Sequence, residues 1–139
     1  MDIILVGHAN TAQAFKEAVE MVFGKVENFH PLSFSPSEGL EELTKKIETA
    51  INPQKAEDTL ILTDLFSGTP YNAAAGLVMH HKAADVIAGM SLPLCLEVAL
   101  SAGQMTVPEL VKHVMANTNE YVKCLSEVVQ ESQKEEDDF

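Results

Sequence analysis

The sequence has no tryptophan, only two tyrosines and two cysteines, and fewer than half as many basic as acidic residues. Nine basic side chains against twenty-one acidic ones give a net charge of −12 at pH 7. This shortage of positive charge disfavours nucleic acid and anionic membrane surfaces as partners. The missing tryptophan and the scarcity of tyrosine also count against a flavin-binding redox module.

The two cysteines, Cys95 and Cys124, are far apart in the chain and lie in apolar stretches. Neither has the spacing of a metal ligand, and two thiols do not make a disulfide framework. They are therefore predicted to be small buried apolar side chains. No run approaches the roughly 20 apolar residues of a membrane span, and the first residues lack the features of a secretory signal. These absences predict a cytoplasmic protein.

Length and composition fit one domain, since 139 residues of which 46% are hydrophobic can supply a core of ordinary size. No internal repeat or interior linker interrupts the chain. The segment Glu131–Asp138 holds five acidic residues and one lysine, and so supplies −4 of the net charge. We therefore predict a single domain over residues 1–131 and an acidic flexible tail over residues 132–139.

Short apolar runs and helical periodicity alternate along the chain. The predicted strands are residues 3–6, 26–34, 59–63 and 85–88. The predicted helices are residues 12–23, 36–51, 69–81, 93–102 and one long helix from 106 to about 129. The second of these helices is expected to begin at Pro36, because Ser35-Pro36-Ser37-Glu38 has the pattern of a capping box with proline at the first helical position.

Strands that alternate with helices through short connections predict a parallel sheet with helices on both faces. We predict a flavodoxin-like three-layer α/β/α fold with strand order 2-1-3-4. In this order the winding reverses between the first and third strands, so their carboxyl ends line one crevice. The first strand leads into His8 and the third into Asp64. The topology therefore predicts that these two side chains meet.

A histidine beside a carboxylate suits nucleophilic attack on phosphorus. The carboxylate accepts the proton of one ring nitrogen, which leaves a lone pair on the other, and it stabilises the positive charge that develops during attack. The segment Phe66–Pro70 adds a loop of small residues that runs into a helix amino end, where an anion is stabilised. Backbone N–H groups of Ser67, Gly68 and Thr69, with the Thr69 hydroxyl, are candidates to hold phosphoryl oxygens.

Each candidate also has a purely structural role open to it. His8 can be a turn residue, Asp64 can cap a turn, and Thr69 can simply start a helix. Their convergence on one crevice favours an active site for phosphate chemistry. No glycine-rich nucleotide motif is present, so no cofactor is predicted. No metal site is predicted either, because the remaining histidines lack ligand spacing: His30, His80, His81 and His113.

Three segments, Ile3–His8, Leu62–Ala73 and Val86–Pro93, resemble the IIA component of mannose-type bacterial sugar phosphotransferase systems. The similarity covers nearly the whole chain in the same order and spacing. The resemblance implies a phosphocarrier that accepts a phosphoryl group from phospho-HPr on His8. His8 then passes this group to a IIB component, which phosphorylates sugar entering through the membrane components IIC and IID.

The resemblance also implies site roles and an assembly. His8 is expected to be phosphorylated on Nε2, Asp64 to hold Nδ1, and Thr69, at a position usually occupied by serine, to bind the phosphoryl group. The family implies a homodimer whose sheet is completed by an exchanged antiparallel strand, which the sequence does not locate. The IIB component is expected on a separate chain. Departures at Gly7-His8-Ala9 and Phe66–Pro70 leave sugar specificity and loop geometry open.

Two other functions stay open at this point. The subunit that donates phosphate to dihydroxyacetone kinase has a similar first domain, and only the acceptor distinguishes it from a sugar-system IIA protein. A non-enzymatic receiver-like signalling module is disfavoured, because such a module needs an acidic cluster after its first strand, where this chain has His8-Ala9-Asn10.

Overall fold

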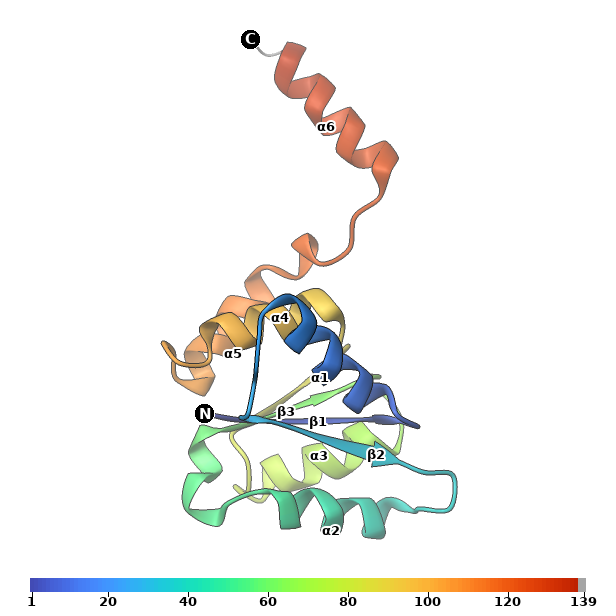
Figure 1. Cartoon of the computed structure of the whole chain (residues 1–139), viewed down its shortest axis with the longest axis vertical. Coiled ribbons are helices and arrows are strands. Elements are labelled where there is room, and N and C mark those ends of the chain that lie inside the picture. Colours follow the sequence, from blue (N-terminus) through green and yellow to red (C-terminus); the bar gives the residue numbers. More distant parts are fainter. Residues whose placement is uncertain (138–139) are drawn as a thin grey trace.

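A four-stranded parallel sheet forms the middle layer of the molecule (Figure 1). The computed structural model describes residues 1–137. The strands are β1 (Asp2–His8), β2 (Phe29–Phe34), β3 (Thr59–Thr63) and β4 (Asp85–Ala88). Their order is β2-β1-β3-β4, so the predicted fold class and strand order are confirmed.

Helices cover both faces of the sheet (Figure 1). One face carries α1 (Thr11–Val22), α4 (Leu92–Ser101) and α5 (Val107–Ala116), and the other carries α2 (Leu40–Ala50) and α3 (Thr69–Met79). Side chains of β1 alternate between these two layers: Ile3 and Leu5 join the first core, and Ile4 and Val6 join the second. Both faces are buried, which explains why β1 is a continuous apolar run.

The second predicted helix begins later than expected. Ser35 N donates to Glu38 Oε1 at 2.8 Å, which is half of a capping box, but α2 starts only at Leu40. The Glu38 carboxylate is also bound by Lys46 Nζ at 2.6 Å, and Gly39 is the N-cap residue. The hydrogen bond between Ser35 and Glu38 therefore closes a turn after β2 and does not start a helix, because the next residue, Gly39, is a weak helix former.

The single long helix predicted after residue 106 is wrong. Helix α5 ends at Ala116, a short 3-10 helix η2 covers Thr118–Glu120, and α6 covers Leu125–Asp137. The run Asn117-Thr118-Asn119 at the break consists of poor helix formers. Leu110 and Val114 are fully buried, whereas Leu125 is 78% exposed. The apolar residues after Thr106 thus recur with one helical period in the sequence, but they belong to two helices. Of these two helices, only α5 packs on the core.

Helix α6 projects away from the three layers (Figure 1). Every residue from Val122 to Asp137 is exposed, including Cys124, so the prediction that this cysteine is buried is wrong. Cys95 is fully buried as predicted, and burial raises the pKa of its thiol to about 12. The tail predicted over residues 132–139 begins inside α6, which continues as far as Asp137. Residues 138–139 of the predicted tail lie outside the described range.

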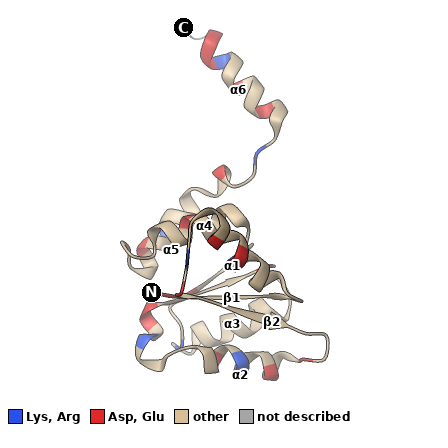
Figure 2. Cartoon of the chain, viewed as in Figure 1, with Lys and Arg blue, Asp and Glu red and all other residues tan. Residues whose placement is uncertain are grey.

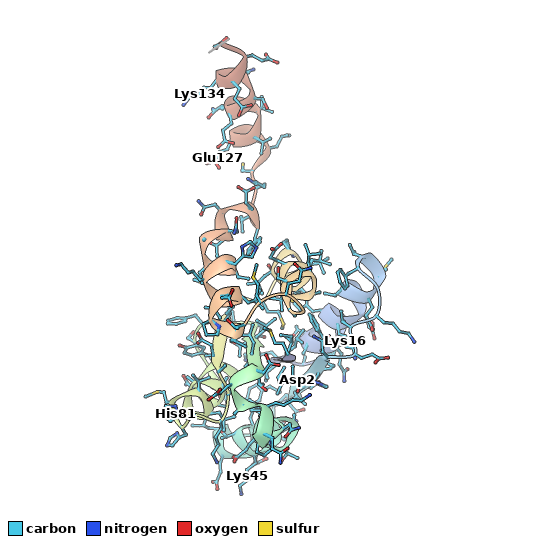
Figure 3. The ribbon with its side chains drawn as sticks, turned by 90° about the vertical axis from the view of Figure 1, so that its left-hand side faces the viewer. Asp2, Lys16, Lys45, His81, Glu127 and Lys134 are labelled. Atoms are coloured by element: carbon cyan, nitrogen blue, oxygen red, sulfur yellow. The ribbon has the colours of Figure 1, made fainter. Side chains whose placement is uncertain are left out.

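Acidic residues are spread over the helices of the body and over α6 (Figure 2). Figure 3 shows Glu127 and Lys134 on α6, well away from the sheet. Within residues 1–137, no helix combines the length and apolar character that crossing a bilayer requires.

Candidate active site

His8 and Asp64 meet at the carboxyl edge of the sheet, as the topology predicted. His8 Nδ1 lies 2.9 Å from Asp64 Oδ2, and the backbone N–H of His8 donates to the same oxygen at 2.9 Å. The two residues come together because β1 and β3 are parallel neighbours, with Val6 paired to Thr63. The His8 side chain is 46% exposed and the Asp64 side chain 15%, so the ring reaches solvent while the carboxylate is largely covered.

The Asp64 carboxylate is held in its charged form. Burial alone raises its pKa, but the backbone N–H and ring of His8 outweigh burial, and the pKa lies below the usual value of an aspartate. An ionised carboxylate only accepts hydrogen bonds, so the contact requires a proton on Nδ1 of His8. In the neutral ring, Nε2 then carries the free lone pair, which is the state a nucleophilic histidine needs.

Gly7 allows the backbone to pass close to the site. A Cβ atom at this position would overlap Thr11 Oγ1 and lie 3.4 Å from Cγ of Asp64. Thr11 Oγ1 donates to the His8 carbonyl at 2.9 Å, which ties the turn after β1 to the start of α1. A side chain at position 7 would therefore displace the groups that hold His8 and Asp64.

The loop before α3 passes beside the imidazole. Gly68 has φ of +110°, a conformation that favours glycine, and a Cβ there would lie 4.0 Å from His8 Cε1. Ser67 is exposed and Thr69, the first residue of α3, is half-buried. The structure thus brings Gly68 to the histidine ring, with Ser67 and Thr69 on either side of it. Phosphoryl binding by these three residues stays a prediction.

Comparisons with known proteins agree on one family. Residues 2–115 match a family described as the IIA component of the fructose phosphotransferase system. The sorbose-specific EIIA component of Lacticaseibacillus casei is 60% identical over 137 residues, which cover 99% of both chains. The fructose-specific EIIA component of Bacillus subtilis is 32% identical over 91% of this chain and 88% of that one. This chain belongs to the mannose-type IIA family.

A solved structure supports the same relationship. The EIIA phosphotransferase component of Streptococcus agalactiae superposes with a TM-score of 0.82 at 25% identity, covering 90% of this chain and 97% of that one. This IIA protein is therefore a component of the sugar phosphotransferase system, whose IIA components are phosphotransferases in general. The resemblance first seen in three segments is confirmed over nearly the whole chain.

Sequence reasoning missed one aromatic neighbour of the active-site histidine in this IIA protein. The ring of Phe34 makes an edge-to-face contact with the ring of His8, with centroids 5.3 Å apart and planes at 84°. The strand order already places the end of β2 next to the end of β1. The exact register, which pairs His8 with Phe34, was not readable from the apolar pattern.

The other histidines of the IIA protein lie outside this site. His80 and His81 lie at the end of α3, and His81 is visible there in Figure 3. His113 Nε2 on α5 lies 2.5 Å from Glu97 Oε1 on α4, so its side chain faces a neighbouring helix. Within residues 1–137, no group of three or more potential ligands is arranged to hold a metal ion. Chemistry without a metal remains a prediction.

Proposed function

We propose that this IIA protein is a phosphocarrier that accepts a phosphoryl group from phospho-HPr on Nε2 of His8 and passes it to a IIB component on a separate chain. The observation that carries the proposal is the His8–Asp64 pair, with Nδ1 held at 2.9 Å and the ring partly exposed. A separate IIB chain is supported by the Lacticaseibacillus casei relative, which is named an EIIA component and is matched over 99% of its length.

The transfer is a displacement at phosphorus. The lone pair of Nε2 attacks the phosphorus atom carried by the HPr histidine, a new N–P bond forms at His8, and the N–P bond to HPr breaks. The HPr nitrogen keeps the bonding electrons, and Asp64 compensates the positive charge that develops on the His8 ring. The same steps in the opposite sense deliver the group to a histidine of IIB.

The phosphoryl oxygens need donors during this transfer. The sequence contains no arginine, so a guanidinium clamp from this chain is ruled out. Backbone N–H groups of Ser67, Gly68 and Thr69, the hydroxyl of Thr69 and the amino end of α3 are suited to the role, because helix amino ends and oriented N–H groups stabilise anions. Catalysis then consists mainly of positioning and electrostatic stabilisation, with no cofactor required.

The test is intact-mass spectrometry after incubation with phosphoenolpyruvate, enzyme I and HPr. We expect one added phosphoryl group that is lost in acid. Adding a IIB component should discharge the protein, whereas a dihydroxyacetone kinase subunit with bound nucleotide should not. An unchanged mass, with HPr itself phosphorylated in the same mixture, would remove the proposal. Discharge by the kinase subunit alone would identify the alternative acceptor.

We further propose that the protein is a homodimer in which the segment Tyr121–Cys124 of each copy pairs antiparallel with β4 of the other. Within residues 1–137, no strand pairs with the outer edge of β4. A groove of about 310 Å³ lies along this edge, lined by β4, Phe66, Tyr71, and Val111 and Met115 of α5. Exposed strand edges are normally covered, and a four-residue segment matches the four residues of β4 in length.

This assembly also explains the isolated C-terminal region. Val122 is 83% exposed and Leu125 is 78% exposed, and α6 rests on no part of its own body in Figure 1. A 13-residue helix is only marginally stable alone in water, so it needs a surface to pack on. A second copy next to β4 supplies that surface for the residues that follow Cys124.

Val122→Asp is expected to convert the dimer to monomer. The change places a carboxylate in an apolar groove at each of two equivalent sites in the dimer. It should raise the dissociation constant about 1,000- to 10,000-fold, since such burial costs about 2–3 kcal/mol per site. Sedimentation equilibrium measures this shift. Met21→Asp is the matched control, because Met21 is 90% exposed and lies on α1, outside the groove. A monomeric wild type, or a dimer that tolerates Val122→Asp, would contradict the assembly.

A further inference from the structure

Phe34 touches the active-site histidine and has no role in the transfer chemistry described above. Its ring meets that of His8 edge to face, with centroids 5.3 Å apart and an interplanar angle of 84°. This is a favourable arrangement for two aromatic rings. We propose that Phe34 is a positioning residue that fixes the plane of the His8 ring for phosphoryl transfer.

The backbone holds Phe34 beside His8. Phe34 is the last residue of β2, paired in register with His8 at the end of β1. Ala9 N donates to the Phe34 carbonyl at 3.0 Å, which forms an isolated bridge just past the ends of the strands. Ala9 adopts φ of +54°, in the left-handed region that is unfavourable for alanine. The chain thus accepts local strain at Ala9 where β1 is tied to Phe34.

The side chain of Phe34 is anchored in the core. It is half-buried and packs against the cluster beneath α2 and α3, as does Leu32 two residues earlier on β2. One end of the Phe34 side chain is therefore fixed by the fold, while its ring is left in contact with the imidazole. A residue placed in this way can restrain its neighbour without touching the substrate.

The hydrogen bond to Asp64 restrains only one atom of the His8 ring. With Nδ1 held at 2.9 Å, the ring can still tilt about that contact, because the χ2 torsion of histidine has broad minima. Tilting redirects the Nε2 lone pair, which has to point at phosphorus along the line of attack. A second contact on the ring, from Phe34, removes this freedom. Misplacement of a reacting group by about 1 Å can lower a rate about 100-fold.

This inference rests on the proposed function, since it concerns transfer at His8. Phe34→Ala is expected to lower the maximal rate of transfer from phospho-HPr about 10- to 100-fold. The HPr concentration at half-maximal rate should stay unchanged, because Phe34 acts on the ring and not on the carrier. Phe34→Tyr keeps an aromatic ring at the position and should retain the wild-type rate.

Leu32→Ala is the matched control. It removes a side chain from the same strand and the same core cluster, at a position that is paired with Val6 and not with His8. Both truncations should lower the melting temperature, but only Phe34→Ala should lower the maximal transfer rate. The proposal is overturned if the two variants transfer at equal maximal rates, or if Phe34→Tyr is as slow as Phe34→Ala.

A second measurement separates this inference from the proposed function. Carbon relaxation at Cε1 of His8 in the unphosphorylated protein reports the mobility of the ring without any transfer. Mobility should increase in Phe34→Ala and stay at the wild-type level in Leu32→Ala. Unchanged mobility in Phe34→Ala overturns the positioning role even if the wild type is phosphorylated. A wild type that gains no phosphoryl group, with the ring ordered by Phe34, overturns the proposed function instead.

Discussion

Replacing His8 with alanine is expected to abolish phosphorylation by phospho-HPr and leave the fold intact. The variant loses the ring that Asp64 holds, and within residues 1–137 no other histidine is hydrogen-bonded to that carboxylate. The imidazole is 46% exposed, so its removal leaves no buried cavity, and the backbone N–H of residue 8 still donates to Asp64. Intact mass after incubation with enzyme I and HPr checks the first point, and circular dichroism the second.

His30→Ala is the control for this experiment. His30 lies on the neighbouring strand, is 43% exposed and also faces an aspartate, with Nε2 3.7 Å from Asp2 Oδ1. Unlike His8, His30 lies near the amino end of its strand, far from the crevice at the carboxyl edge of the sheet. His30→Ala should therefore be phosphorylated like the wild type. A His8→Ala protein that still gains an acid-labile phosphoryl group would show that another residue is the acceptor.

Asp64→Asn is expected to slow transfer by up to about 10,000-fold without unfolding the protein, because a catalytic-triad histidine that loses its orienting carboxylate is slowed about that much. The neutral amide cannot compensate the positive charge that develops on the His8 ring. Its NH₂ group can also donate to Nδ1, which moves the ring proton to Nε2 and removes the lone pair needed for attack. Rapid-quench kinetics measure the rate, and nitrogen chemical shifts of the His8 ring report the tautomer.

The same variant has a predicted pH signature. Asp64 has a lowered pKa in the folded protein, so its ionised form stabilises the fold at neutral pH. This contribution is complete above the unfolded-state pKa of about 3.9 and is lost as the pH falls through the lower folded-state pKa. The difference in unfolding free energy between wild type and Asp64→Asn should therefore shrink on strong acidification. Denaturant unfolding at neutral and acidic pH tests this.

Asp2→Asn is the matched control, because Asp2 also faces a histidine but lies at the first residue of β1, at the opposite end of the strand from His8. It should leave the transfer rate and the His8 tautomer unchanged. Asp64→Asn at the wild-type rate would contradict the orienting role of Asp64. A shifted tautomer with an unchanged rate would show that the proton on Nδ1 does not control attack.

Much of this site could be predicted from local patterns. Continuous apolar runs mark strands buried on both faces, and the alternation with helices restricts the connections to a parallel, right-handed arrangement. Those rules place the ends of the first and third strands together, and so bring His8 to Asp64. The small residues around Gly68 mark the loop beside them. These inferences need only the order of residues along each element and the handedness common to all such folds.

The predictions from sequence were wrong where one residue pattern is compatible with two structural environments. The apolar stripe after Thr106 is continuous in sequence, but Val114 has a core beneath it and Leu125 does not. A helical period reports which side chains share a face and does not report what covers that face. The capping-box pattern at Ser35 likewise specifies a hydrogen bond, which formed at 2.8 Å, without deciding whether a helix or a turn follows.

The sequence by itself determined the layers, the strand order and the pairing of His8 with Asp64, because strand ends and hydrophobic periods are local properties. Only the tertiary structure decided that one oxygen of Asp64 accepts both the backbone N–H and Nδ1 of His8, and that Phe34 contacts the imidazole. These details depend on strand register and on the direction of side chains from separate elements. Packing of the whole core sets both, and no short stretch of sequence encodes them.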